Sequence, residues 1–196
     1  MNTIFNSKVF KGVSIAGKIV KGMVKNGVTF YEKKELPSNA ILDLPFQNNF
    51  TDYGKIGMTM IAGGTSNQPT FALSGRKAGE YCAVFNGSQS IKTAANLPIN
   101  SNKVTIAFWI KTTQTTTGII AELSPSWFSS GVNAFATSVN SGTANKLYMG
   151  EQTTNTVRNA RDSSANINDD AWKRITVVID RTKGTANKIT LYINGS

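Results

Sequence analysis

The acidic side chains are the first candidates for chemistry, because hydrolysis of glycosidic bonds needs paired carboxylates acting as acid and base or nucleophile. The chain has eleven acidic residues, but they are scattered, and Glu122 and Glu151 each stand alone in the sequence. No histidine occurs among the 196 residues, which excludes Ser-His-Asp and Cys-His nucleophilic sites and most transition-metal sites. These residues predict a protein that is not an enzyme.

Sugar binding is a second kind of chemistry, and it uses aromatic rings with polar groups on loops, since a sugar ring offers an apolar C–H face and several hydroxyls. Trp127 and Phe128 lie between serines in "SPSWFSSG", and Asn155 and Arg158 lie in the polar stretch "TTNTVRNARDSS". We take these four as candidate ligand-binding residues. The alternative is that both rings simply close one end of the fold.

The composition limits the partners. The net charge is +10, but the lysines and arginines are spread along the chain without interleaved aromatic residues, so we expect no nucleic-acid binding. No run approaches the roughly 18 apolar residues of a membrane span, and the first residues lack the apolar run of a signal peptide. We therefore expect that the protein is made in the cytoplasm and does not insert into a membrane. The single cysteine, Cys82, is expected to be a small buried apolar residue.

The first 35 residues contain a repeat of period ten, "KVFKGVSIAG" followed by "KIVKGMVKNG". Each copy predicts a short strand closed by a glycine turn, and together with "VTFYEK" they predict a small β-meander. Seven lysines against two glutamates give residues 1–35 half of the total excess charge. We interpret this segment as a docking module, because a small basic sheet with free edges suits pairing with another chain; a decorated extension of the main domain is the alternative. The candidate docking residues are Lys8, Lys11, Lys18, Lys21 and Lys25.

From residue 36 onward, apolar strands alternate with long polar loops rich in Ser, Thr, Asn and Gly, without a convincing helical stretch. The candidate strands are 40–46, 80–86, 103–111, 118–123, 132–138, 145–150, 172–180 and 188–194. In 103–111, Ile106, Phe108 and Ile110 share one face while Ala107 and Trp109 share the other, which predicts a strand covered on both faces. This pattern is typical of an all-β fold, a two-sheet sandwich or jelly roll.

Five segments in sequence order resemble the concanavalin A-like, laminin G-type jelly-roll domains. They are "LDLPFQNNFTDYGKIG", "FNGSQSI", "VTIAFWIKT", "AWKRITVVID" and "ITLYINGS". The resemblance implies one such domain over residues 40–196, preceded by the small β-meander module. Glycosidases of this class carry a Glu-x-Asp-x-x-Glu strand, which this chain lacks. Some laminin G-type domains hold calcium where Asn49 and Asp52 stand, but one carboxylate is few for calcium, so we expect no cofactor.

The basic segment is similar to N-terminal modules of bacteriophage structural and fibre proteins. With the jelly roll, it implies a non-enzymatic virion protein, a head or tail fibre or a capsid decoration. Such a protein would contact other virion proteins through its N-terminal module and host-surface glycans through the jelly roll. A bacterial secreted or surface carbohydrate-binding module is the alternative function, and a glycoside hydrolase is the third.

The last stretch, "KITLYINGS", alternates apolar and polar residues as a half-buried strand does, and Asn194-Gly195 predicts a tight hairpin turn, as does Asn86-Gly87. In laminin G-type domains further strands follow this one. We therefore expect the domain to be incomplete at its C-terminal end. Either the chain is part of a longer polypeptide, or a strand from a neighbouring copy in a homo-oligomer completes the sheet.

Overall fold

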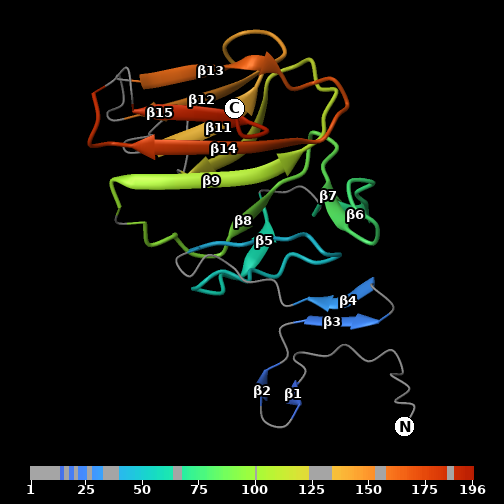
Figure 1. Ribbon diagram of the computed structural model, residues 1–196. Coiled ribbons are helices and arrows are strands. Elements are labelled where there is room, and N and C mark those ends of the chain that lie inside the picture. The colour runs from blue at the N-terminus through green and yellow to red at the C-terminus, as the bar shows by residue number, and fades with distance from the viewer. Residues whose placement is uncertain are drawn as a thin grey trace.

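The computed structural model describes residues 14–15, 18–19, 22–25, 28–32, 40–63, 68–99, 101–123, 134–152, 158–184 and 188–196. Of residues 14–32 and of Arg158, only the backbone is described. Regular secondary structure within these ranges is β-strand throughout (Figure 1), as the sequence predicted. The described part contains no helix long and apolar enough to cross a membrane.

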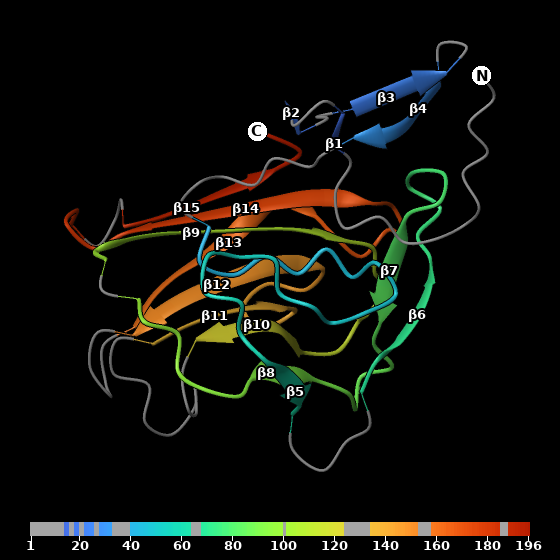
Figure 2. The ribbon, with the colours of Figure 1, turned by 90° about the horizontal axis from the view of Figure 1, so that it is seen from below.

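Two antiparallel sheets form the body of the protein. One has the order β10 (Gly118–Leu123), β11 (Ala134–Val139), β12 (Lys146–Gln152) and β13 (Arg158–Asn166). The other has the order β15 (Ile189–Ile193), β14 (Lys173–Asp180) and β9 (Lys103–Ile110). Figure 2 shows the two sheets as two layers. The predicted two-sheet jelly-roll sandwich is confirmed.

The core lies between the layers because alternate residues of the strands point inward. On β14, Ile175, Val177 and Ile179 are almost completely buried, whereas Arg174 on the other face is exposed. Strand β12 contributes Leu147 and Met149 from the opposite layer, both with no exposed surface. The remaining buried members are Phe135, Val139, Ile167 and Ile189.

Shorter strands precede the sandwich in the chain. Strand β5 (Met60–Ala62) pairs with β8 (Ile91–Thr93), and β6 (Thr70–Leu73) pairs with β7 (Tyr81–Val84), all antiparallel. Ahead of them come two hairpins with separate sheets. Their strands are β1 (Ser14–Ile15) with β2 (Lys18–Ile19), and β3 (Gly22–Lys25) with β4 (Val28–Glu32).

The prediction of a strand over residues 40–46 is wrong. Pro45 has no N–H to donate, and the positive φ angles of Phe46 (54°) and Asn48 (57°) turn the chain away from an extended course. Isolated bonds take the place of a ladder: the Ala40 carbonyl accepts from the Lys55 amide at 2.9 Å, and the Asp43 carbonyl from the Tyr53 amide at 2.8 Å.

The turn predicted at Asn194-Gly195 is present and has the geometry expected of type I′. Both residues have positive φ, 56° and 92°, and Ile193 and Ser196 exchange two backbone hydrogen bonds of 2.9 and 3.2 Å. At Asn86-Gly87 only the glycine has positive φ, and the Asn86 side-chain oxygen accepts from the Ser88 amide instead. That turn is therefore an Asx turn, and the prediction of equivalent hairpin chemistry at the two dipeptides is wrong.

Candidate functional site

The outer face of the β9, β14 and β15 sheet carries two exposed aromatic side chains. Trp109 on β9 stands opposite Arg174 on β14, and one step along the face Thr176 stands opposite Tyr192 on β15. Trp109 is 44% exposed and Tyr192 is 39% exposed. Strand alternation places both rings on this face because their neighbours Phe108, Ile110, Leu191 and Ile193 pack on the core.

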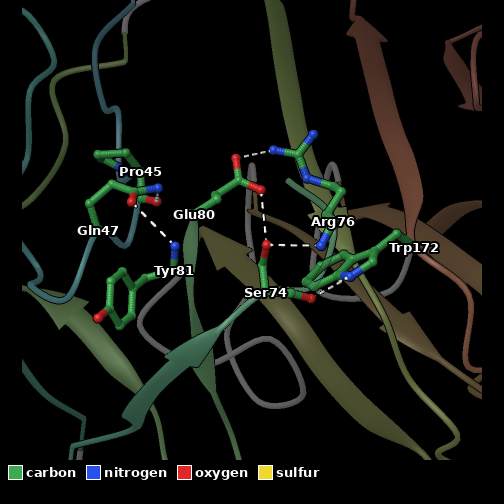
Figure 3. Close-up of polar contacts among 7 residues, drawn as sticks. All are labelled: Pro45, Gln47, Ser74, Arg76, Glu80, Tyr81 and Trp172. Carbon is green, nitrogen blue, oxygen red and sulfur yellow. Dashed lines mark hydrogen bonds and ion pairs between the residues drawn. The ribbon is translucent and has the colours of Figure 1, made fainter. Parts of the chain in front are cut away.

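One ring of this face is also part of a cation–π contact. The guanidinium carbon of Arg76, in the turn between β6 and β7, lies 4.3 Å from the centroid of the Trp109 ring. Arg76 is held in place by an ion pair with Glu80, and Glu80 also accepts a hydrogen bond of 3.1 Å from the Ser74 hydroxyl (Figure 3). The β6–β7 turn thus covers part of Trp109 but leaves Ala107 exposed, so the prediction that this face of β9 is covered is only partly right.

A second tryptophan fixes the same turn. The indole N–H of Trp172 donates to the Ser74 carbonyl at 2.9 Å, and the Tyr81 amide donates to the Gln47 side chain at 3.2 Å (Figure 3). A two-stranded hairpin alone is marginal in water. Contacts with Trp109, Trp172 and Gln47 therefore position the β6–β7 hairpin and the guanidinium that it carries.

A buried charge cluster lies at the other end of the strands. Glu151 on β12 has no exposed surface and accepts from the Asn159 side chain at 3.0 Å. Its other contacts cross to the second sheet, to Arg181 after β14 at 2.9 Å and to Lys188 before β15 at 3.6 Å. This arrangement binds the two layers together and leaves the Glu151 carboxylate fully engaged.

The loops that hold the predicted ligand-binding residues start and end near this cluster. Across the sheet, the successive register partners at this end are Leu123, Phe135, Glu151 and Asn159. The β10–β11 and β12–β13 connections therefore leave from the same end of the strands. Trp127, Phe128 and Asn155 lie outside the described residues. Arg158 was expected in a loop, but it is the first residue of strand β13, where it pairs with Gln152 of β12.

The candidate docking lysines are described only in part. Lys18 is in β2 and Lys25 is in β3, with their backbones alone described. Lys8, Lys11 and Lys21 lie outside the described residues.

Asp52 and Asn49, the calcium candidates, organise a loop instead. The buried Asp52 carboxylate accepts from the backbone amides of Asp43, Gly54 and Met58 at 2.7–2.8 Å. The Asn49 side-chain oxygen accepts from the Thr51 amide at 2.9 Å. Amide donors thus occupy the oxygens that calcium would need, and the described residues contain no cluster of three or more acidic or cysteine side chains that could hold a metal.

These bonds make Asp52 sensitive to acid. Burial alone would raise its pKa, but the three amide donors outweigh burial and hold the pKa below its usual value. Since the folded-state pKa is lower than the unfolded value of about 3.9, Asp52 stabilises the fold above that pH, and this contribution is lost as the pH falls through the folded-state pKa.

We therefore expect Asp52→Asn to lower the free energy of unfolding at pH 7 by about 1–3 kcal/mol, because an amide cannot accept all three bonds. The difference from the original protein should narrow below about pH 4. Urea unfolding at pH 7 and at stepwise lower pH measures this. A difference that is independent of pH would contradict the assignment.

Four further nucleophilic or acidic groups have their own surroundings in the described part of the chain. Glu122 is exposed on β10, while Glu151 is held inside the sandwich by two cations and an amide. Asp180 accepts from the Thr182 hydroxyl at 2.5 Å and pairs with Lys103 at 3.3 Å. Cys82 is half-buried, and burial together with the Glu80 charge raises the pKa of its thiol, which favours the protonated form.

Two antiparallel sheets over one apolar core define a jelly-roll sandwich. The chain belongs to the concanavalin A-like lectin/glucanases superfamily, whose family model matches residues 85–196. Carbohydrate or protein binding is the function that this class of domain suggests. No curated protein and no solved structure was found to match the chain.

Sequence reasoning missed the exposed aromatic pair. Trp109 was placed on the correct face of its strand, but a cover was expected over it, and Tyr192 was treated only as a polar alternate of "ITLYING". The signal was available: alternation places Trp109, Arg174 and Tyr192 on one side of three strands, but the order of those strands in the sheet was needed to bring them together.

Proposed function

We propose that this protein is a non-enzymatic structural component of a bacteriophage virion, a fibre or capsid decoration. Its jelly-roll domain binds glycans or other proteins. The observation that carries the binding part is the open outer face with Trp109, Arg174 and Tyr192. In the described residues the carboxylates that a hydrolase would use are engaged in structural ion pairs or stand apart, which supports a binding role over catalysis.

The virion part of the proposal is supported by the first 35 residues. They carry half of the excess positive charge, and the strands described there form two separate two-stranded sheets, whose outer edges have no partner among the described residues. Positive charge and free strand edges both favour attachment to an acidic partner protein. In this proposal residues 1–35 dock on the particle and residues 40–196 face outward. Labelling intact particles with an antibody against the sandwich domain tests it: labelled particles support the proposal, and unlabelled particles contradict it.

Deleting residues 1–35 is expected to abolish incorporation into the particle while the sandwich stays folded, because the described core residues, from Val104 to Ile193, all come from the sandwich itself. Particle-bound protein is measured by immunoblot, and folding by circular dichroism. A companion variant with Lys8, Lys11, Lys18, Lys21 and Lys25 changed to glutamine separates charge from strand pairing. Normal incorporation of the deletion variant would refute the docking role.

A further inference from the structure

The two outer faces of the sandwich differ in their access to solvent. On the four-stranded sheet, Ala134, Ala136 and Ser138 of β11 are at most 2% exposed although they point away from the core residues Phe135 and Val139. On the three-stranded sheet, the outward residues Thr105, Ala107 and Arg174 are exposed. The three-stranded sheet therefore offers the open flat surface.

The register fixes the layout of this surface. Trp109 and Arg174 are direct cross-strand partners, and Tyr192 is the partner of Thr176, two residues further along β14. With strand spacings of about 4.8 Å and a rise of about 3.4 Å per residue, the Trp109 and Tyr192 positions are roughly 12 Å apart, with Arg174 between them. The positions that carry two aromatic rings and a guanidinium thus lie on one face of the sheet, with Arg174 on the middle strand.

Among the described residues, the charges around this face leave the Arg174 guanidinium without a carboxylate partner. Asp180 at the far end of the face pairs with Lys103, and Glu80 pairs with the Arg76 guanidinium over Trp109. No carboxylate among the described residues lies within ion-pair distance of Arg174. Its backbone is held by Asn194, since its amide donates to the Asn194 side chain at 2.9 Å and its carbonyl accepts from the Asn194 amide at 2.8 Å.

We propose that this face binds a carboxylate-bearing polysaccharide. The Tyr192 ring and the part of the Trp109 ring that Arg76 does not cover contact the C–H faces of two sugar units. The Arg174 guanidinium forms a forked pair of hydrogen bonds with a carboxylate on the chain between them. The Thr176 hydroxyl, in the same row as Tyr192, is placed to bond a sugar hydroxyl. The net charge of +10 draws an acidic polymer toward the protein. This inference rests on the proposed binding function and names its ligand class.

Calorimetric titration of the full chain with polygalacturonate, and with the same polymer fully methyl-esterified, tests the inference. We expect binding of the acid form and much weaker binding of the ester, because the ester has no charge for Arg174 to pair. Arg174→Ala and Tyr192→Ala should each weaken binding of the acid form about tenfold or more. Arg174→Lys should restore little, because an ammonium cannot form the forked pair.

Two matched controls isolate the site. Lys183→Ala removes one exposed charge after β14, and Tyr53→Ala removes an aromatic ring that is 53% exposed outside the sandwich sheets. Both should bind as the original protein does. No binding of polygalacturonate, equal binding of the ester, or equal weakening by Lys183→Ala would overturn the inference. If particle labelling were still positive, such a result would leave the virion proposal standing.

Discussion

Replacing Glu151 by alanine is expected to lower the free energy of unfolding by about 3–5 kcal/mol. The substitution leaves Arg181 and Lys188, which are mostly buried, without the carboxylate that they share between the two sheets. It also removes the acceptor of the Asn159 side chain. Glu151→Gln should cost less, since an amide oxygen still accepts from Asn159. Chemical denaturation monitored by tryptophan fluorescence measures the loss.

Lys111→Ala is the matched control for this prediction. It breaks the ion pair of Lys111 with Asp170, whose side chains are 41% and 63% exposed, and such exposed pairs contribute only about 0.2–1 kcal/mol. Equal effects of Glu151→Ala and Lys111→Ala would mean that the buried cluster does not hold the two layers together.

Replacing Leu147 by alanine is expected to cost about 2–5 kcal/mol, because the side chain has no exposed surface and its removal leaves a cavity between the sheets. Its backbone bond to the Ser163 hydroxyl, 3.0 Å long, does not depend on the side chain. The expected effect is therefore one of packing, and the midpoint of urea unfolding should fall without a change in the slope.

A leucine-to-alanine change at an exposed position is the control, because it removes the same side-chain atoms without leaving a cavity in the core. Leu73 on β6 is 65% exposed, so Leu73→Ala should change the free energy of unfolding by no more than about 0.5 kcal/mol. If Leu147→Ala were equally mild, Leu147 could not belong to the core assigned to it.

The strands that could be predicted are those whose apolar residues alternate. The patterns of "VTIAFWIK" and "KRITVVID" correspond to β9 and β14, which pair with each other. Strand β13, "RNARDSSAN", was missed because it is polar. Among the described strands it forms a ladder with β12 alone, at the edge of the sheet, and this ladder rather than apolar alternation defines it. The short strands β5, β6 and β8 were missed because three or four residues are too few for a period to be seen.

Less of the candidate site could be predicted. Asp52 was selected as an oxygen ligand, but its role depends on where three backbone amides lie, which no spacing of side chains encodes. The Arg76 contact with Trp109 depends on how the β6–β7 hairpin docks, a tertiary event. Residue types therefore indicated which side chains could bind a ligand. The order of the strands and the packing of the loops decided which of those side chains lie next to each other.

The pairing of β9 with β14 also constrains how the protein folds. Residues 103–110 form their ladder with residues 173–180, so the whole of 111–172 must be synthesised before β9 gains this partner. Until then an apolar strand with two free edges is present on the ribosome, and sheets closed by such distant pairs fold slowly, on the scale of about milliseconds to seconds. Aggregation of the nascent chain therefore competes with closure of the sandwich, and slower translation after residue 110 would lengthen that exposure.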